Sequence, residues 1–116
     1  ADFVMTLDCL HDMPRPDIAL KAIHGALKDD GTLLVKEIKS SATWADNLRN
    51  PVLALMYATS ITTCLSSAMS DIDTLGLGTL GLNPELLSVM IKDAGFTSFH
   101  QHKVEDPTNL YYEIRP

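Results

Sequence analysis

The sequence predicts an α/β fold: two parallel strands joined by a crossover helix, then further helices and a terminal antiparallel hairpin. Two short apolar runs, 3–7 and 32–35, lack the alternation of a half-exposed strand, as in a parallel sheet covered on both faces. The segment between them has helical spacing of apolar residues. The two extended segments at the end, 96–104 and 109–115, are separated by a connection short enough for a hairpin.

The first half of the chain has the order strand, helix, strand. The run 3–7 ends at Asp8, and Pro16 is well suited to begin the helix that follows. An Asp-Asp-Gly turn at 29–31 then leads into the second strand, which ends at Glu37. Because such crossovers are right-handed and join parallel strands, both strands are expected to finish at the same edge of the sheet.

The second half of the chain is predicted to be helical before it returns to strands. A long helix is expected over 45–69, with a break near Asn50-Pro51. Its uncharged part, 51–70, is long enough to span a membrane, but one apolar stripe and many Ser and Thr residues favour a packed helix. The stripe consists of Leu53, Met56, Tyr57, Ile61, Cys64, Leu65 and Ala68. A further helix is expected between the cap Asn83 and Gly95. Alternation in 109–115 indicates weaker burial than in the first two strands.

Composition narrows the class of protein. The 116 residues include 15 acidic and 9 basic side chains, and the net charge of −6 argues against nucleic-acid binding. Cys9 and Cys64 lie far apart in sequence, which favours two free thiols and a cytoplasmic location. No metal site is predicted. The G-x-G-x-x-G match at 76–81 follows a helix instead of a strand, so a flexible connection is favoured over a cofactor loop.

The candidate chemistry lies at the carboxyl edge of the parallel strands, where open α/β sheets bind ligands. His11 and Asp12 follow the first strand closely, and Glu37 ends the second. A neighbouring carboxylate raises the pKa of an imidazole and fixes the orientation of its ring, which suits a general base. That His11 merely caps the following turn is equally compatible with this pattern. Trp44 is predicted either to contact substrate or to anchor the long helix.

Two segments resemble a known family. Asp8-Cys9-Leu10-His11-Asp12-Met13 and the later segment 26–37, ALKDDGTLLVKE, are similar to the later motifs of class I S-adenosylmethionine-dependent methyltransferases. The likeness covers essentially the whole chain, as the C-terminal half of that Rossmann-like sheet. It is nearest to plant-type small-molecule O-methyltransferases and to methyltransferases with a winged-helix region. The resemblance implies S-adenosylmethionine as cofactor and a small-molecule methyl acceptor.

The resemblance also implies roles for single residues. His11 would be the base, Glu37 the acidic residue that orients it, and Asp12 the partner beside it. Asp8, with Cys9 and Leu10, would approach the methionine part of the cofactor. Two positions depart from the plant-type pattern: Met13 replaces an aromatic residue, and Leu7 replaces a lysine that meets the cofactor.

The glycine-rich loop and the acidic residue that hold the cofactor in this family have no counterpart in the sequence. We therefore expect residues 1–116 to be a partial methyltransferase domain that lacks its N-terminal cofactor-binding half and is inactive alone. The leading hypothesis is methyl transfer to oxygen or nitrogen with His11 as base. The alternative is a noncatalytic interaction or dimerisation module. The first strand would lie next to the absent strand, so self-association, or association with the N-terminal half, is also expected.

Overall fold

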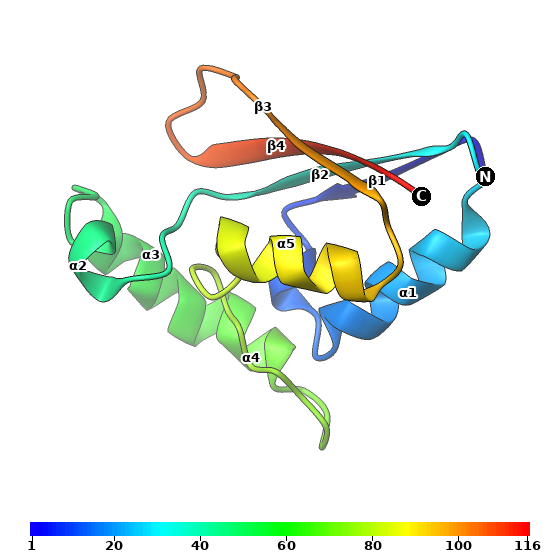
Figure 1. Cartoon of the computed structure of the whole chain (residues 1–116). Helices are drawn as coiled ribbons and strands as arrows, with labels where there is room; N and C mark the ends of the chain where they lie inside the picture. The colour runs from blue at the N-terminus through cyan, green and yellow to red at the C-terminus, as the bar shows by residue number, and fades with distance from the viewer.

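A computed structural model describes all 116 residues as a four-stranded sheet with its helices gathered on one side (Figure 1). The chain begins with β1 (Phe3–Leu7), the 3₁₀ turn η1 (Leu10–Asp12), α1 (Pro16–Ala26) and β2 (Thr32–Ile38). It continues with α2 (Trp44–Asn47), α3 (Leu53–Thr59), the π-helical turn η2 (Ser60–Cys64) and α4 (Leu65–Ala68). It ends with α5 (Pro84–Asp93), β3 (Ser98–His102) and β4 (Asn109–Arg115). The predicted fold class is confirmed.

The parallel pair forms as the sequence predicts. β1 and β2 are joined through α1, and their register runs from Phe3 opposite Thr32 to Leu7 opposite Lys36. The backbone N–H of Asp8 continues the ladder by donating to the carbonyl of Lys36 at 2.9 Å. The loop after β1 therefore begins beside the end of β2, next to Glu37.

The strand order β1-β2-β4-β3 places β1 at one edge and β4 inside the sheet. The prediction that β1 is covered on both faces is wrong, because Phe3, Met5 and Leu7 are each more than half exposed. These alternate side chains lie on the sheet face that has no helices over it, whereas Thr6 points to the opposite face and is buried. β1 has a neighbouring strand, β2, on one side only.

The hydrophobic core lies between the sheet and helices α1 and α5. Twelve buried residues form it: Leu10, Leu20, Leu33, Val35, Leu82, Leu87, Met90, Ile91, Ala94, Phe96, Tyr112 and Ile114. The predicted helix after Asn83 is present as α5, and the Asn83 side chain accepts a hydrogen bond from the N–H of Leu86 at 3.0 Å. Tyr112 and Ile114 of β4 are almost completely buried, so β4 is covered better than β1, contrary to the expectation from alternation.

The segment 44–68 is broken as predicted, and the residues of the predicted apolar stripe are buried or half-buried except Ile61. α2 ends at Asn47, before the Asn50-Pro51 break, and α3 begins at Leu53. The π turn η2 adds a residue to one turn and rotates the chain beyond it. Within this turn Ile61 is 66% exposed and Ser60 is buried, and Ala68 is buried in α4. No helix combines the length and apolar character needed to cross a membrane.

The glycine motif 76–81 lies between α4 and α5 and follows no strand. It is packed and not merely a flexible connection, because Thr79 and Leu80 are buried and the N–H of Thr79 donates to the Ser60 hydroxyl at 3.1 Å. The motif therefore fixes the position of η2 against the loop before α5.

Candidate functional site

The loop after β1 turns sharply and places an imidazole inside the protein. Asp8 adopts a φ of 51°, in the left-handed region that non-glycine residues rarely occupy. The 3₁₀ turn η1 follows, and its first residue, Leu10, is fully buried in the core. His11 comes next with 2% of its surface exposed. Burial of Leu10 thus anchors the turn that carries His11.

Glu37 of β2 holds this turn with both carboxylate oxygens. Oε1 accepts a hydrogen bond from the backbone N–H of Leu10 at 2.9 Å, and Oε2 lies 2.6 Å from Nδ1 of His11. Glu37 is 2% exposed, so the pair is shielded from water. The structure therefore brings His11 and Glu37 together, with the ring fixed through Nδ1 and its second nitrogen, Nε2, left for other partners.

Asp12 and Cys64 lie at that second nitrogen. Asp12 Oδ1 is 3.2 Å from His11 Nε2, although the side chain of Asp12 is 37% exposed. The Cys64 thiol, at the end of η2, lies within 4.8 Å of ligand atoms of both residues. Sequence reasoning placed Cys64 only in an apolar stripe. No local signal identifies its contact with His11, because the contact depends on how the broken helix 44–68 folds back over η1.

The environment of His11 favours its protonated form. Burial alone would lower the pKa of the imidazole, but the hydrogen bond and negative charge of Glu37, assisted by Cys64 and Asp12, outweigh it and raise the pKa to about 9. The direction is the one expected from a neighbouring carboxylate. The charged ring is therefore the major form at neutral pH, and the neutral ring that can accept a proton at Nε2 becomes the major form only above about pH 9.

Asp8, Cys9 and Leu10, the residues expected to contact the cofactor, have different surroundings in the structure. The Asp8 carboxylate is bound by the Lys36 ammonium and by the side-chain amide of Asn109, so both of its oxygens are engaged within the chain. Leu10 belongs to the core, and burial raises the pKa of the partly exposed Cys9 thiol. Neither parallel strand is followed by a glycine-rich loop. Contact with a cofactor stays a prediction for these residues.

Trp44 makes its aromatic contact with α3 and not with the imidazole pair. It is 60% exposed, and its ring is tilted against that of Tyr57 in α3 with 5.3 Å between the centroids. Trp44 therefore packs α2 against α3. Contact with substrate stays a prediction for this residue.

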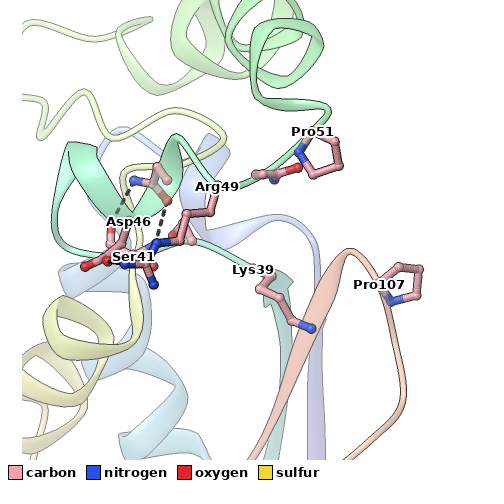
Figure 2. A pocket seen from close by; sticks show the side chains of 9 residues that line it. Lys39, Ser41, Asp46, Arg49, Pro51 and Pro107 are labelled. Carbon is pink, nitrogen blue, oxygen red and sulfur yellow. Dashed lines mark hydrogen bonds and ion pairs between the residues drawn. The ribbon is translucent and has the colours of Figure 1, made fainter.

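A polar cavity of about 290 Å³ lies beyond the end of β2 (Figure 2). No hydrophobic side chain lines it, and its charged residues are Lys39, Asp46 and Arg49. Its wall is held by Asn47, whose amide pairs with the backbone of Ser41 in both directions at 2.9 Å. The residues that line the cavity begin at Lys39, shortly after Glu37 in the sequence, and the cavity lies at the sheet edge where α/β proteins bind ligands.

The raised pKa of His11 predicts a pH-dependent contribution to stability. The folded-state pKa of about 9 lies above the unfolded value near 6.5, so the stabilisation is complete below about pH 6.5 and is lost as the pH rises through 9. Urea unfolding should show that Glu37→Gln lowers the free energy of unfolding strongly at pH 6 and much less at pH 10. The control Glu105→Gln, at an exposed carboxyl, should have the same small effect at both values. A Glu37→Gln effect independent of pH would contradict this interpretation.

Comparison with known proteins adds the wider context. No protein-family model and no curated protein sequence matches the chain. Solved structures match over 99% of its length. An O-methyltransferase family protein from Burkholderia thailandensis is 19% identical with a TM-score of 0.66. Human N-acetylserotonin methyltransferase, solved in complex with SAM, is 21% identical with a TM-score of 0.66. A putative O-methyltransferase from Nostoc punctiforme is 18% identical with a TM-score of 0.70.

The similarity covers a limited share of those proteins. The chain spans 30% of the Burkholderia protein, 29% of the human enzyme and 31% of the Nostoc protein. At these identities the likeness concerns the fold and not the activity. The two parallel strands, the crossover helix and the antiparallel β3–β4 pair together give this chain the fold of the C-terminal half of a Rossmann-like methyltransferase domain.

Proposed function

We propose that this chain is the proton-accepting half of an S-adenosylmethionine-dependent methyltransferase that acts on an oxygen or nitrogen atom of a small molecule. The observation on which this rests is the buried pair in which Glu37 Oε2 lies 2.6 Å from His11 Nδ1 and leaves Nε2 as the proton-accepting atom. The resemblance of the loop 8–13 and the segment 26–37 to methyltransferase motifs supports the same activity. The solved structures with this fold support it further.

His11 is proposed as the general base. In the neutral form of the ring, which the raised pKa makes the minor form below about pH 9, Nδ1–H donates to Glu37. Nε2 then takes the proton of the acceptor hydroxyl or amine as that atom becomes the nucleophile. Glu37 is a positioning residue, since it fixes the ring and stabilises the imidazolium that proton transfer creates. Asp12, 3.2 Å from Nε2, stabilises the same charge. S-adenosylmethionine would supply the methyl group.

The acceptor is proposed to be a polar small molecule that binds in the cavity beyond β2. Proton transfer to the buried His11 then requires a movement of the chain that opens this cavity to the ring. The cavity is lined without hydrophobic side chains and offers one carboxylate and two cations, which suits hydroxyl, amine or carboxylate groups. Trp44 is proposed as an additional contact at the border of this region. Met13, in place of an aromatic residue, argues against a phenolic acceptor.

Replacing the base tests this proposal. We expect His11→Ala to lower kcat for methyl transfer by about a hundred- to ten-thousandfold in the full-length protein, because proton transfer in the transition state contributes about that much. The control His100→Ala removes an exposed imidazole of β3 and should keep the activity. Transfer of labelled methyl groups to small polar alcohols and amines is the measurement. A loss of less than about tenfold would argue against His11 as base.

The cofactor is expected to bind weakly to the 116 residues alone. The Asp8 oxygens are engaged by Lys36 and Asn109, and no glycine-rich loop follows β1 or β2. Titration calorimetry of this chain with S-adenosylmethionine should give little or no heat of binding. Low-micromolar affinity would overturn the expectation and would require a binding site made from other residues of the chain.

A noncatalytic interaction or dimerisation module is the second candidate function. The exposed side chains of Phe3, Met5 and Leu7 favour it, because they form an apolar row on the uncovered face of an edge strand. The partner would be a second copy of the chain or the N-terminal half of a methyltransferase domain. The two candidates are compatible if pairing completes the catalytic site.

The apolar row predicts self-association of the 116-residue chain. Light scattering should show the mean mass rising with concentration, and Met5→Lys should reduce this rise by placing a charge in the row. Ile72→Lys is the matched control, because Ile72 is fully exposed in the loop between α4 and α5. A chain that stays monomeric at high concentration would remove the basis for this candidate.

A further inference from the structure

Three side chains of metal-ligand type meet beside η1. The ligand atoms of His11, Asp12 and Cys64 all lie within 4.8 Å of one another. His11 and Asp12 belong to η1, whereas Cys64 ends η2, far away in the sequence. The cluster joins the strand-end loop to the helical segment, and its nitrogen, oxygen and sulfur donors are those that zinc binds in proteins.

The imidazole in this cluster is oriented as a metal ligand would be. Glu37 occupies Nδ1, which makes Nε2 the nitrogen that faces the carboxylate of Asp12 at 3.2 Å. Histidines that bind metals usually donate their other ring N–H to a carboxylate, which fixes the tautomer and makes the ligand nitrogen more basic. The Glu37–His11 pair has this arrangement, and each of the two residues is only 2% exposed.

One atom of the cluster is a buried acceptor whose nearest polar neighbour is a donor only in its charged state. Oδ1 of Asp12 has essentially no exposed surface and makes no hydrogen bond. His11 Nε2, 3.2 Å away, offers it a proton when the ring is charged and none when the ring is neutral. A buried carboxylate oxygen left unsatisfied is unfavourable, and a bound cation would satisfy it. This observation is independent of the spacing of the three ligands.

We propose that His11 Nε2, Asp12 Oδ1 and Cys64 Sγ form a binding site for a transition-metal ion of the Zn²⁺ type, with three protein ligands and one open position. Neighbouring ligands of a tetrahedral zinc ion lie about 3.3–3.8 Å apart, given bonds of about 2.0–2.3 Å. The observed separations need to close by only about 1 Å to reach that range. The proposal goes beyond the methyl-transfer function and does not rest on it. An ion bound at Nε2 would occupy the atom proposed to accept the proton, so metal binding would block that activity.

Cobalt provides a direct test, because a Co²⁺ ion bound by a thiolate has an intense charge-transfer absorption. We expect the full chain, without an affinity tag, to bind one Co²⁺ ion with this absorption and to release it to Zn²⁺. Cys64→Ser should abolish the thiolate band and weaken binding at least tenfold. Cys9→Ser changes the only other cysteine and should leave both unchanged. Asp12→Asn should weaken binding without removing the band.

The outcomes separate the proposal from its competitors. No band in the unmodified chain, or a band that survives Cys64→Ser, would overturn the site. Binding lost only on His102→Gln would assign the ion to the exposed His100–His102 pair instead and would equally overturn it. If Cys64→Ser does not fold, as judged by circular dichroism, X-ray absorption of the unmodified zinc complex decides. One sulfur with nitrogen and oxygen neighbours supports the site, and a shell without sulfur refutes it.

Discussion

The buried contact between Glu37 and His11 is the constraint on which the site depends. One carboxylate binds both the backbone N–H of Leu10 and the ring of His11, so the end of β2 determines the conformation of the loop after β1. Neither side chain is accessible to water, and each charge would be costly without the other. The parallel register of β1 and β2 is therefore a condition for the chemistry as well as for the fold.

The sheet has one face covered by helices and one open face, and the covered face carries both the hydrophobic core and Glu37. Leu33, Val35 and Tyr112 pack under α1 and α5 on the covered face, and Glu37 lies on the same face at the end of β2. Phe3, Met5 and Leu7 of the edge strand β1 lie on the opposite, open face and are exposed. The imidazole pair is thus formed entirely by residues of this chain, and β1 has a neighbouring strand on one side only.

Sequence reasoning succeeded where the interaction is local or set by strand order. Asn83 and Pro84 predict α5, and the βαβ order predicts that His11 and Glu37 meet at one edge. It failed for residues whose burial depends on a neighbouring layer of the fold. Phe3 and Met5 have the pattern of a fully covered strand, but whether a second layer covers them is not encoded in their spacing. The helical spacing places Cys64 on the inward side, but its approach to His11 depends on how the segment 44–68 folds over η1, which no local pattern encodes. Ile61, in the π turn Ser60–Cys64, is exposed although its spacing predicts burial.

The protonation state of His11 is the most direct test of this account. The imidazole nitrogens can be followed by ¹⁵N NMR against pH, with His11 assigned by comparison with His11→Gln. The account predicts an imidazolium that persists to about pH 9 and then a neutral ring protonated at Nδ1, the atom beside Glu37. Titration near the ordinary value of about 6.5, or a neutral ring protonated at Nε2, would contradict it.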